Sequence, residues 1–310
     1  MAHNENRSGM TFVAAAALIW GTIGVAVSLL YRIDETNPLS VGFLRLIISA
    51  PALLILGYLL VGPNLLKLHR RSDAWPMLLI GAAFAGYQVC YFAAITRLGV
   101  ATAVLINICS GPIFTAILAR FMLNEHLSRR TFLAMLGAIS GTALLVGGAP
   151  QAADPPALAE GAALALGAGF CYSLVVIGSR MVAADYHPLQ PIALAFSLGA
   201  LLLLPFALAG GLVLNYSPTG WGILIYLGIV PTALGYWLYL RGMRSVPAAT
   251  AAILTLLEPL GSSLLALLLL DERLAPLGVL GAMLLLASMA LLSGRRVDLW
   301  LRRIFIRRPA

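Results

Sequence analysis

The chain has 310 residues, of which 61% are hydrophobic and only 10% are charged. A soluble globular protein of this length needs a larger polar surface, so the composition excludes a soluble fold and predicts an integral membrane protein. The formal net charge of +8 does not indicate a nucleic-acid binder. The arginines lie in short breaks between apolar segments and in the tail, and no nucleic-acid-binding motif is present.

The apolar residues form long segments along the whole chain. A helix that crosses the roughly 30 Å hydrocarbon core of a bilayer needs about 20 mostly apolar residues. Ten segments fulfil this requirement, at approximately 11–31, 39–61, 75–96, 100–122, 131–148, 158–182, 189–212, 220–240, 246–270 and 276–293. The alternating pattern of β-barrel strands is absent. The sequence therefore predicts an all-α integral membrane protein with ten transmembrane helices.

The positions of arginine and lysine predict how the chain is oriented in the membrane. If the N-terminus is cytoplasmic, the cytoplasmic segments hold most positive residues, and the outer loops hold only Arg32, Arg97 and Arg273. Cytoplasmic loops are enriched in positive residues, so the pattern favours this orientation. Ten crossings return the chain to the same side. We therefore expect a multi-pass protein of the inner (plasma) membrane with both termini in the cytoplasm.

The two halves of the chain repeat one pattern. Its matched pairs are Pro112 with Pro259 and Glu125 with Glu272, 147 residues apart, and Pro38 with Pro188 and Trp20 with Phe170, 150 residues apart. Matched prolines and glutamates at one spacing argue against chance similarity between apolar helices. Each half holds five helices, an odd number, so the second half enters the membrane from the opposite side. The sequence predicts inverted-topology repeats at 1–150 and 151–294.

The last residues, 295–310, form a separate basic tail. Its sequence "RRVDLWLRRIFIRRP" combines arginine pairs with Val297, Trp300, Leu301 and Ile304, which follow helical spacing. We expect a cytoplasmic helix that lies at the membrane surface and binds anionic lipids. A disordered basic tail is the alternative interpretation.

Three stretches resemble a known family. "EPLGSSLLALLLLDERLAPLGVLGAMLLLASMALL" resembles the end of an EamA-type domain, "GPIFTAILARFMLNEHLSRRTFLAMLGAISGTALLVGG" resembles the same part in the first half, and "FLRLIISA" resembles the family's second helix with its arginine. The chain is similar to the drug/metabolite transporter superfamily in its ten-helix form with two EamA-type domains. Within that superfamily it resembles the YddG-type aromatic amino acid exporters in overall similarity.

This resemblance implies export of amino acids or similar metabolites, with some organic cations. The chain departs from an internally symmetric pattern at one position, because Gly111 stands before the first proline where the second half has Glu258. A mechanism that needs two symmetric carboxylates is therefore in doubt.

Two charged residues lie inside predicted helices. Glu258 is near the middle of the ninth helix, where a charge costs a few kcal/mol unless it faces a cavity or a partner. It is a candidate cation, proton or substrate-amine site, or else a carboxyl group hydrogen-bonded within the bundle. Arg45 lies seven residues inside the second helix. It could bind a substrate carboxylate, pair with an acid or extend to the membrane surface.

Aromatic and small polar side chains complete the candidate cavity. The aromatic candidates are Trp20, Phe43, Tyr87, Tyr91, Phe170, Tyr236 and Trp237. Such residues could stack on an apolar substrate or hold a cation, although each of them alone is also typical of packing. Asn107 and Ser110 share a face of the fourth helix and could anchor a substrate or bond a neighbouring helix. Gly137 and Gly141 form a GxxxG motif for close helix packing, within the protein or between protomers.

The sequence thus predicts an exporter of amino acids that alternates access to a central cavity, with a small-molecule substrate and a lipid bilayer as its partners. Drugs, lipophilic cations or other metabolites are the alternative substrates, and a channel or a membrane-embedded enzyme is a remote alternative. No cofactor, metal site or nucleic-acid partner is expected. Phosphate-binding loops of the Walker type are absent, which argues against direct use of ATP. Proton coupling through Glu258 and downhill export both stay open.

Overall fold

The computed structural model describes residues 2–98, 100–146, 155–269 and 276–293, and within these ranges all regular structure is helical. The first half contains α1 (Ala2–Trp20), α2 (Thr22–Ile33), α3 (Pro38–Val61), the short 3₁₀ helices η1 (Gly62–Leu66) and η2 (Arg71–Asp73), α4 (Ala74–Leu98), α5 (Val100–Met122) and α6 (Arg129–Val146). The second half contains α7 (Pro155–Val182), α8 (Leu189–Ala209), α9 (Pro218–Leu227), the π-helix η3 (Gly228–Leu234), α10 (Gly235–Met243), α11 (Ala248–Leu254), α12 (Leu257–Leu269) and α13 (Pro276–Ser293).

Eight helical stretches among the described residues are long and apolar enough to cross a membrane. This agrees with the predicted all-helical membrane protein. The two other predicted crossings, 131–148 and 276–293, coincide with α6 and α13, which do not belong to those eight. The count of ten crossings and the cytoplasmic termini therefore stay predictions. The predicted surface helix at 295–310 lies outside the described residues.

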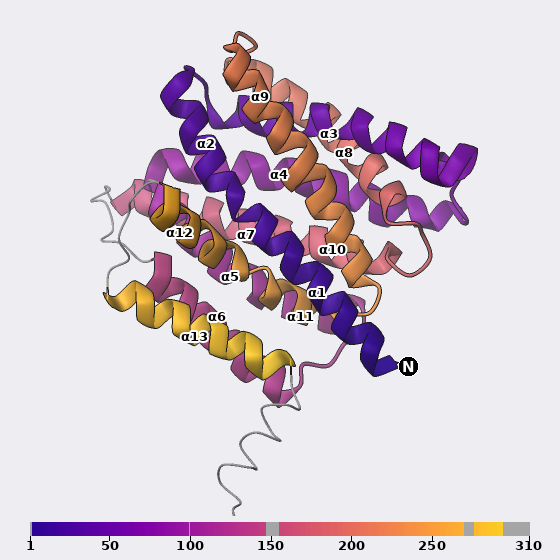
Figure 1. The fold of residues 1–310 in the computed structure, drawn as a ribbon, viewed down its shortest axis with the longest axis vertical. Coiled ribbons are helices and arrows are strands. Elements are labelled where there is room, and N and C mark those ends of the chain that lie inside the picture. The colour runs from indigo at the N-terminus through magenta and orange to yellow at the C-terminus, as the bar shows by residue number, and fades with distance from the viewer. Residues whose placement is uncertain (1, 99, 147–154, 270–275, 294–310) are drawn as a thin grey trace, which may run out of the picture.

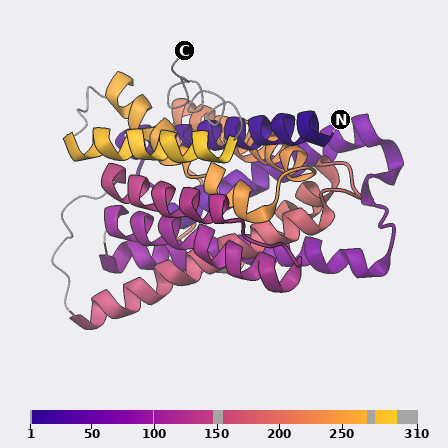
Figure 2. The same ribbon diagram turned by 90° about the horizontal axis from the view of Figure 1, so that it is seen from below.

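Matched helices of the two halves run antiparallel. Asn37, which precedes α3, donates from Nδ2 to the carbonyl oxygen of Gly211, just after the end of α8, at 2.8 Å. In the other pair, α6 and α13, Gly137 lies against Ser288 and Gly141 lies against Gly281. Figure 1 shows these two pairs at opposite edges of the bundle, with the other long helices between them, and Figure 2 shows the helices lying in layers. Opposite directions are what an inverted repeat predicts.

The GxxxG motif packs inside the protein. A Cβ atom added at Gly141 would lie 2.8 Å from both the carbonyl oxygen of Gly281 and the backbone nitrogen of Leu285. Such distances leave no space for a side chain between the two backbones. Of the two interpretations of this motif, the structure supports close packing of α6 on α13 within one chain.

Two of the long crossing segments are interrupted at a proline. Pro259 has no amide hydrogen and its ring clashes with the carbonyl four residues earlier, that of Thr255. The ninth predicted helix, 246–270, is accordingly not continuous, because it divides into α11 and α12 at Thr255 and Leu256. Pro231 acts in the same way inside η3, and the carbonyl of Leu227 that it leaves free accepts a hydrogen bond from Thr232 Oγ1 at 2.7 Å.

A third interruption lies next to the first of these. The first crossing segment divides into α1 and α2 at Gly21. A Cβ atom added at Gly21 would lie 2.9 Å from the carbonyl oxygen of Glu258 and from the backbone nitrogen of Ser262. The backbone of the first segment therefore touches the beginning of α12. The absence of a side chain at Gly21 permits this contact beside Glu258.

We expect Gly141→Ala to destabilise the protein, because the added methyl group must displace backbone atoms of α13. Overpacking of this kind lowers the free energy of unfolding by about 1–3 kcal/mol. Thermal unfolding in detergent would measure the change. Gly222→Ala is the matched control, because a Cβ atom there meets no atom within 4 Å. Equal melting temperatures for the two variants would contradict the close α6–α13 contact.

Candidate functional site

Two opposite charges lie near each other in the middle of the bundle. Glu258 is in the first turn of α12 and Arg45 is on α3, and both are half-buried. They interact electrostatically but form no direct ion pair with each other. Charges in a protein interior are costly unless other groups compensate them. The pair is thus arranged so that each charge is available to a further group.

The π-helix holds Arg45 in place. Arg45 Nε donates to Thr232 Oγ1 at 3.1 Å, and Thr232 is itself fixed by its bond to the Leu227 carbonyl. Among the described residues, neither terminal nitrogen of Arg45 has a hydrogen-bond partner. These two nitrogens are the donors that guanidinium groups present to a carboxylate in bidentate contacts. The irregular backbone of η3 therefore orients a free binding group.

Tyrosines surround the two charges. Tyr87 on α4, Tyr172 on α7 and Tyr236 on α10 all interact electrostatically with Glu258. The ring centroids of Tyr87 and Tyr172 are 6.1 Å apart. Tyr91 extends this wall along α4, because its ring stacks on Tyr87 with centroids 5.6 Å apart and planes 7° apart. Tyr87, Tyr91 and Tyr172 keep partial solvent exposure, so their faces are accessible.

Tyr236 is held by a second, buried aromatic layer. Its ring centroid lies 4.7 Å from that of Trp20, 5.0 Å from that of Phe196 and 5.4 Å from that of Phe84. Trp20 Nε1 also donates to the carbonyl oxygen of Pro231 at 2.8 Å, inside η3. Trp20 thereby joins the first crossing segment to the π-helix and supports the wall of the site.

Asn107 adds an unpaired polar atom to this region. Its side chain is 6% exposed and interacts with Tyr87. Among the described residues, Asn107 Oδ1 has no hydrogen-bond partner. A buried amide oxygen without a partner costs about 1–3 kcal/mol, so such atoms are typical of positions that a ligand or water completes.

The structure does not bring every predicted site residue to this centre. Phe170 is 40% exposed, and its ring contacts that of Phe114 on α5. Trp237 is half-buried, and the guanidinium carbon of Arg241 is 5.5 Å from its ring centroid. Neither ring contacts the tyrosines around Glu258.

Ser110 and Phe43 also lie outside the centre. Ser110 Oγ bonds the Asn107 carbonyl of its own helix, and it fills the close α5–α7 contact at Gly169. Phe43 is buried on α3 two residues before Arg45. Two residues correspond to roughly 200° around a helix, so the two side chains face different ways.

Sequence reasoning missed Tyr172 and Thr232. Phe170 is among the predicted cavity residues, although Tyr172, two residues later, is the one whose ring lies 6.1 Å from that of Tyr87. Thr232 follows Pro231 directly. A hydroxyl beside a proline in a membrane helix could have been recognised as a replacement donor for the freed carbonyl. Among the described residues, no group of three or more metal-ligating side chains occurs.

Comparison with known proteins decides the family. The model of the EamA-like transporter family matches residues 7–147 and again residues 159–294. The chain belongs to the EamA-like transporter family. "Uncharacterized transporter YwfM" of Bacillus subtilis is 30% identical to this EamA-like transporter over 91% of the chain and 92% of its own length. "Uncharacterized inner membrane transporter YicL" of Salmonella typhimurium is also 30% identical, over 93% of the chain and 96% of its own length.

A solved crystal structure shares the fold of this EamA-like transporter. It superposes with a TM-score of 0.78 at 19% sequence identity, over 92% of this chain and 96% of its own. The family model thus matches the chain twice, once in each half. Family membership makes the protein a multi-pass membrane transporter with a small-molecule substrate.

Trp20→Phe should lower the stability of this EamA-like transporter. The variant keeps an aromatic ring beside Tyr236 but loses the hydrogen bond to Pro231, whose carbonyl would be left buried without its donor. A loss of about 1–3 kcal/mol in the free energy of unfolding is expected, measured as a lower unfolding temperature in detergent. Trp237→Phe is the control, because Trp237 is half-buried and its ring makes no aromatic contact with that of Tyr236 and no hydrogen bond to Pro231 in the part of the chain that the structure describes. A smaller loss of stability for Trp20→Phe than for Trp237→Phe would show that the bond from Trp20 to Pro231 does not stabilise the fold.

Proposed function

We propose that this EamA-like transporter exports amino acids, aromatic ones included, from the cytoplasm across the inner membrane by alternating access to the Glu258–Arg45 site. The single observation that supports this most is the pair of opposite charges, near each other but not in contact, inside a shell of tyrosines. An amino acid carries one positive and one negative charge on neighbouring atoms. It would compensate both residues at once.

The proposed binding mode assigns a role to each group. The substrate carboxylate accepts hydrogen bonds from the free terminal nitrogens of Arg45. The ammonium group binds the carboxylate of Glu258, and Asn107 Oδ1 accepts one of its protons. The side chain lies against Tyr87 and Tyr172, where an aromatic ring gains from stacking. In this mode the site carries no net unpaired charge when occupied.

The interrupted helices support alternating access. Broken helices with irregular backbone beside the binding site are a recurring feature of secondary transporters, because they can bend and can present backbone groups to a ligand. Here the breaks at Gly21, at η3 and at Thr255–Leu256 all lie near Glu258 or Arg45. Movement at these breaks would change access to the site without unfolding whole helices.

A lipophilic cation is the second candidate substrate. A carboxylate among tyrosine rings is a typical site for an organic cation, which needs no partner for Arg45. This alternative is favoured by the four tyrosines that interact with Glu258, namely Tyr87, Tyr91, Tyr172 and Tyr236.

Efflux from reconstituted vesicles separates the two candidates. Vesicles loaded with labelled phenylalanine should release it faster than vesicles without protein. Unlabelled phenylalanine should compete more strongly than phenethylamine, which lacks the carboxylate, or hydrocinnamate, which lacks the amine. If phenethylamine or tetraphenylphosphonium competes best, the cation assignment replaces the amino acid assignment. If no amino acid moves faster than in empty vesicles, the proposed substrate class is wrong.

Substitutions at Arg45 and Thr232 should act in a graded way. Arg45→Gln removes the carboxylate partner and should weaken binding of phenylalanine about tenfold to a hundredfold. Thr232→Val keeps the guanidinium but removes its anchor, so a smaller loss is expected. Binding of phenethylamine should change little in either variant. Equal losses of binding for phenylalanine and phenethylamine would show that Arg45 does not bind the substrate carboxylate.

Efflux with and without a pH gradient tests proton coupling through Glu258. If the carboxylate carries the coupled proton, Glu258→Gln should abolish the response of efflux to the gradient, because the amide does not titrate. The native chain measured in the same vesicles is the control. An unchanged response in Glu258→Gln would exclude this residue as the proton carrier.

A further inference from the structure

We propose that Glu125, Arg180 and Arg244 form a latch that closes the end of the bundle where α1 begins, and that the inverted repeat carries an incomplete copy of this latch at the other end. The proposal rests on the alternating access proposed above but not on the identity of the substrate. We refer to the two ends as the latch end and the opposite end.

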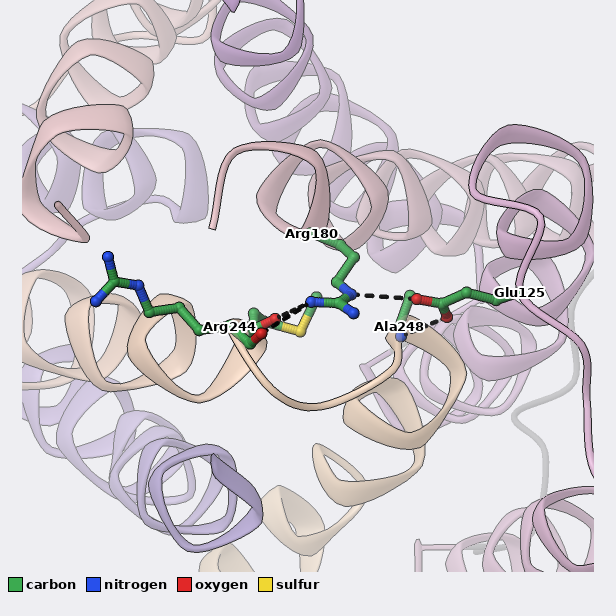
Figure 3. A network of polar contacts seen from close by, with 5 residues as sticks. Glu125, Arg180, Arg244 and Ala248 are labelled. Atoms are coloured by element: carbon green, nitrogen blue, oxygen red, sulfur yellow. Dashed lines mark hydrogen bonds and ion pairs between the residues drawn. The ribbon is translucent and has the colours of Figure 1, made fainter. Parts of the chain in front are cut away.

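Arg180 and Glu125 form the centre of the latch (Figure 3). Arg180, near the end of α7, donates from Nε to Glu125 Oε1 at 3.1 Å and from Nη1 to the carbonyl oxygen of Met243 at 2.7 Å. The other carboxylate oxygen, Oε2, accepts from the backbone nitrogen of Ala248 at 2.9 Å. The side chains of Arg180 and Glu125 are only 26% and 21% exposed. Charge-assisted bonds with this limited exposure are stronger than surface ion pairs.

Arg244 ties the segment between α10 and α11 to the loop after α7. Its Nε donates to the carbonyl oxygen of Ala183 at 2.9 Å, and its Nη2 donates to that of Tyr186 at 3.3 Å. Arg180 Nη1 in turn reaches the carbonyl of Arg244 at 3.2 Å. The segment between α10 and α11 is therefore bonded both to the loop after α5 and to the end of α7 and the loop that follows it. These elements come from both halves of the chain.

The latch holds the segment that leads to the candidate site. A Cβ atom added at Gly9 of α1 would contact Ser245 and Gly242, which places the latch beside the beginning of α1. Ala248 is the first residue of α11, and α11 ends at the interruption immediately before Glu258. Release of Ala248 from Glu125 would therefore free the start of α11. That movement would be transmitted over two helical turns to the break at Thr255.

The inverted repeat carries part of this latch at the opposite end. Arg97 and Arg244 are 147 residues apart, the spacing that also relates the matched prolines Pro112 and Pro259. The counterparts of Ala183 and Tyr186, 150 residues earlier, are Ile33 and Thr36.

The opposite end is not fastened by Arg97 in the same way. Instead of reaching the Ile33 or Thr36 carbonyl, Arg97 pairs with Glu160 through Nη2 at 2.7 Å and bonds the Ala93 carbonyl of its own helix. Two equivalent arginines are therefore engaged differently at the two ends. This difference is what alternating access requires of a gate.

Other polar contacts join the two halves at both ends, and at the opposite end Asp34 accepts from Ser217 N at 3.0 Å and from Ser217 Oγ at 2.9 Å. At the latch end the Tyr186 hydroxyl donates to Asp73 Oδ2 at 2.6 Å. At the opposite end Thr36, the counterpart of Tyr186, shares a hydrogen bond with the hydroxyl of Tyr216. Contacts present at both ends in one conformation are part of the constant framework. The latch differs because, among the described residues, Arg97 forms no bond equivalent to those of Arg244.

One position makes the two ends unequal. Arg180 corresponds, 150 residues earlier, to Leu30, which is fully buried. At the latch end Arg180 neutralises Glu125, whereas the opposite end has no cation at the equivalent position. Arg180→Leu, which gives both positions the same residue, should therefore weaken closure of the latch end relative to closure of the opposite end.

Accessibility of single cysteines in reconstituted vesicles tests the latch. Cys90, Cys109 and Cys171 are first replaced by alanine. One reporter, Ala252→Cys, lies on α11 where the native side chain is 0% exposed, and the other, Tyr91→Cys, lies in the half-buried wall toward the end of α4. In Arg180→Leu a membrane-impermeant maleimide should label Ala252→Cys at least about tenfold faster, the factor for losing one charged hydrogen bond, and Tyr91→Cys more slowly.

Three further variants complete the test. Arg120→Leu removes an exposed arginine outside the latch and should leave both labelling rates unchanged. Glu125→Gln keeps an acceptor for Ala248 and should give a smaller increase than Arg180→Leu. Arg180→Lys keeps the charge and serves if the leucine variant does not fold. Unchanged labelling of Ala252→Cys would overturn the proposal, and so would faster labelling of both reporters, which indicates general loosening. Neither readout depends on which substrate is transported.

Discussion

A carboxylate in the middle of a membrane-embedded bundle must be compensated by charge or by polar groups, because hydrocarbon and close-packed side chains solvate it poorly. Glu258 imposes this constraint on the EamA-like transporter. Arg45 supplies the opposite charge without contacting it, and tyrosines from three helices supply polarisable surroundings. The arrangement stabilises the charge while leaving both groups able to bind something else.

The same region contains the irregular backbone. The carbonyl that Pro231 leaves free is satisfied by Thr232, and Thr232 also anchors Arg45. The hydroxyl that satisfies the free carbonyl therefore also holds the positive charge that faces Glu258. Trp20 adds a third link, because it bonds the Pro231 carbonyl and packs on Tyr236. A change in the shape of η3 would therefore move both Arg45 and the aromatic side chains of Trp20 and Tyr236.

Composition and the lengths of the apolar segments predicted the helical membrane architecture, and the spacing of matched residues predicted two repeats, which the two family matches support. The interruption beside Glu258 follows from Pro259, which cannot donate a backbone hydrogen bond. The direction of individual side chains was less predictable. Phe170 and Tyr172 are both aromatic residues in the middle of α7, and only the rotation of that helix against α4 and α5 decides which one faces Tyr87. The π-helix is a comparable case, because one wide turn shifts the facing of every later residue and no single-residue signal fixes its position.

The partners of the latch have a consequence for how relatives can diverge. Arg180 and Arg244 bond carbonyl oxygens of Met243, Ala183 and Tyr186, and Glu125 accepts from the amide of Ala248. Main-chain atoms persist whatever side chain is attached, apart from the amide hydrogen that proline lacks. Evolutionary drift at these partner positions can therefore proceed without loss of the closure. The sequence requirement for the closure is therefore concentrated in the side chains of Glu125, Arg180 and Arg244.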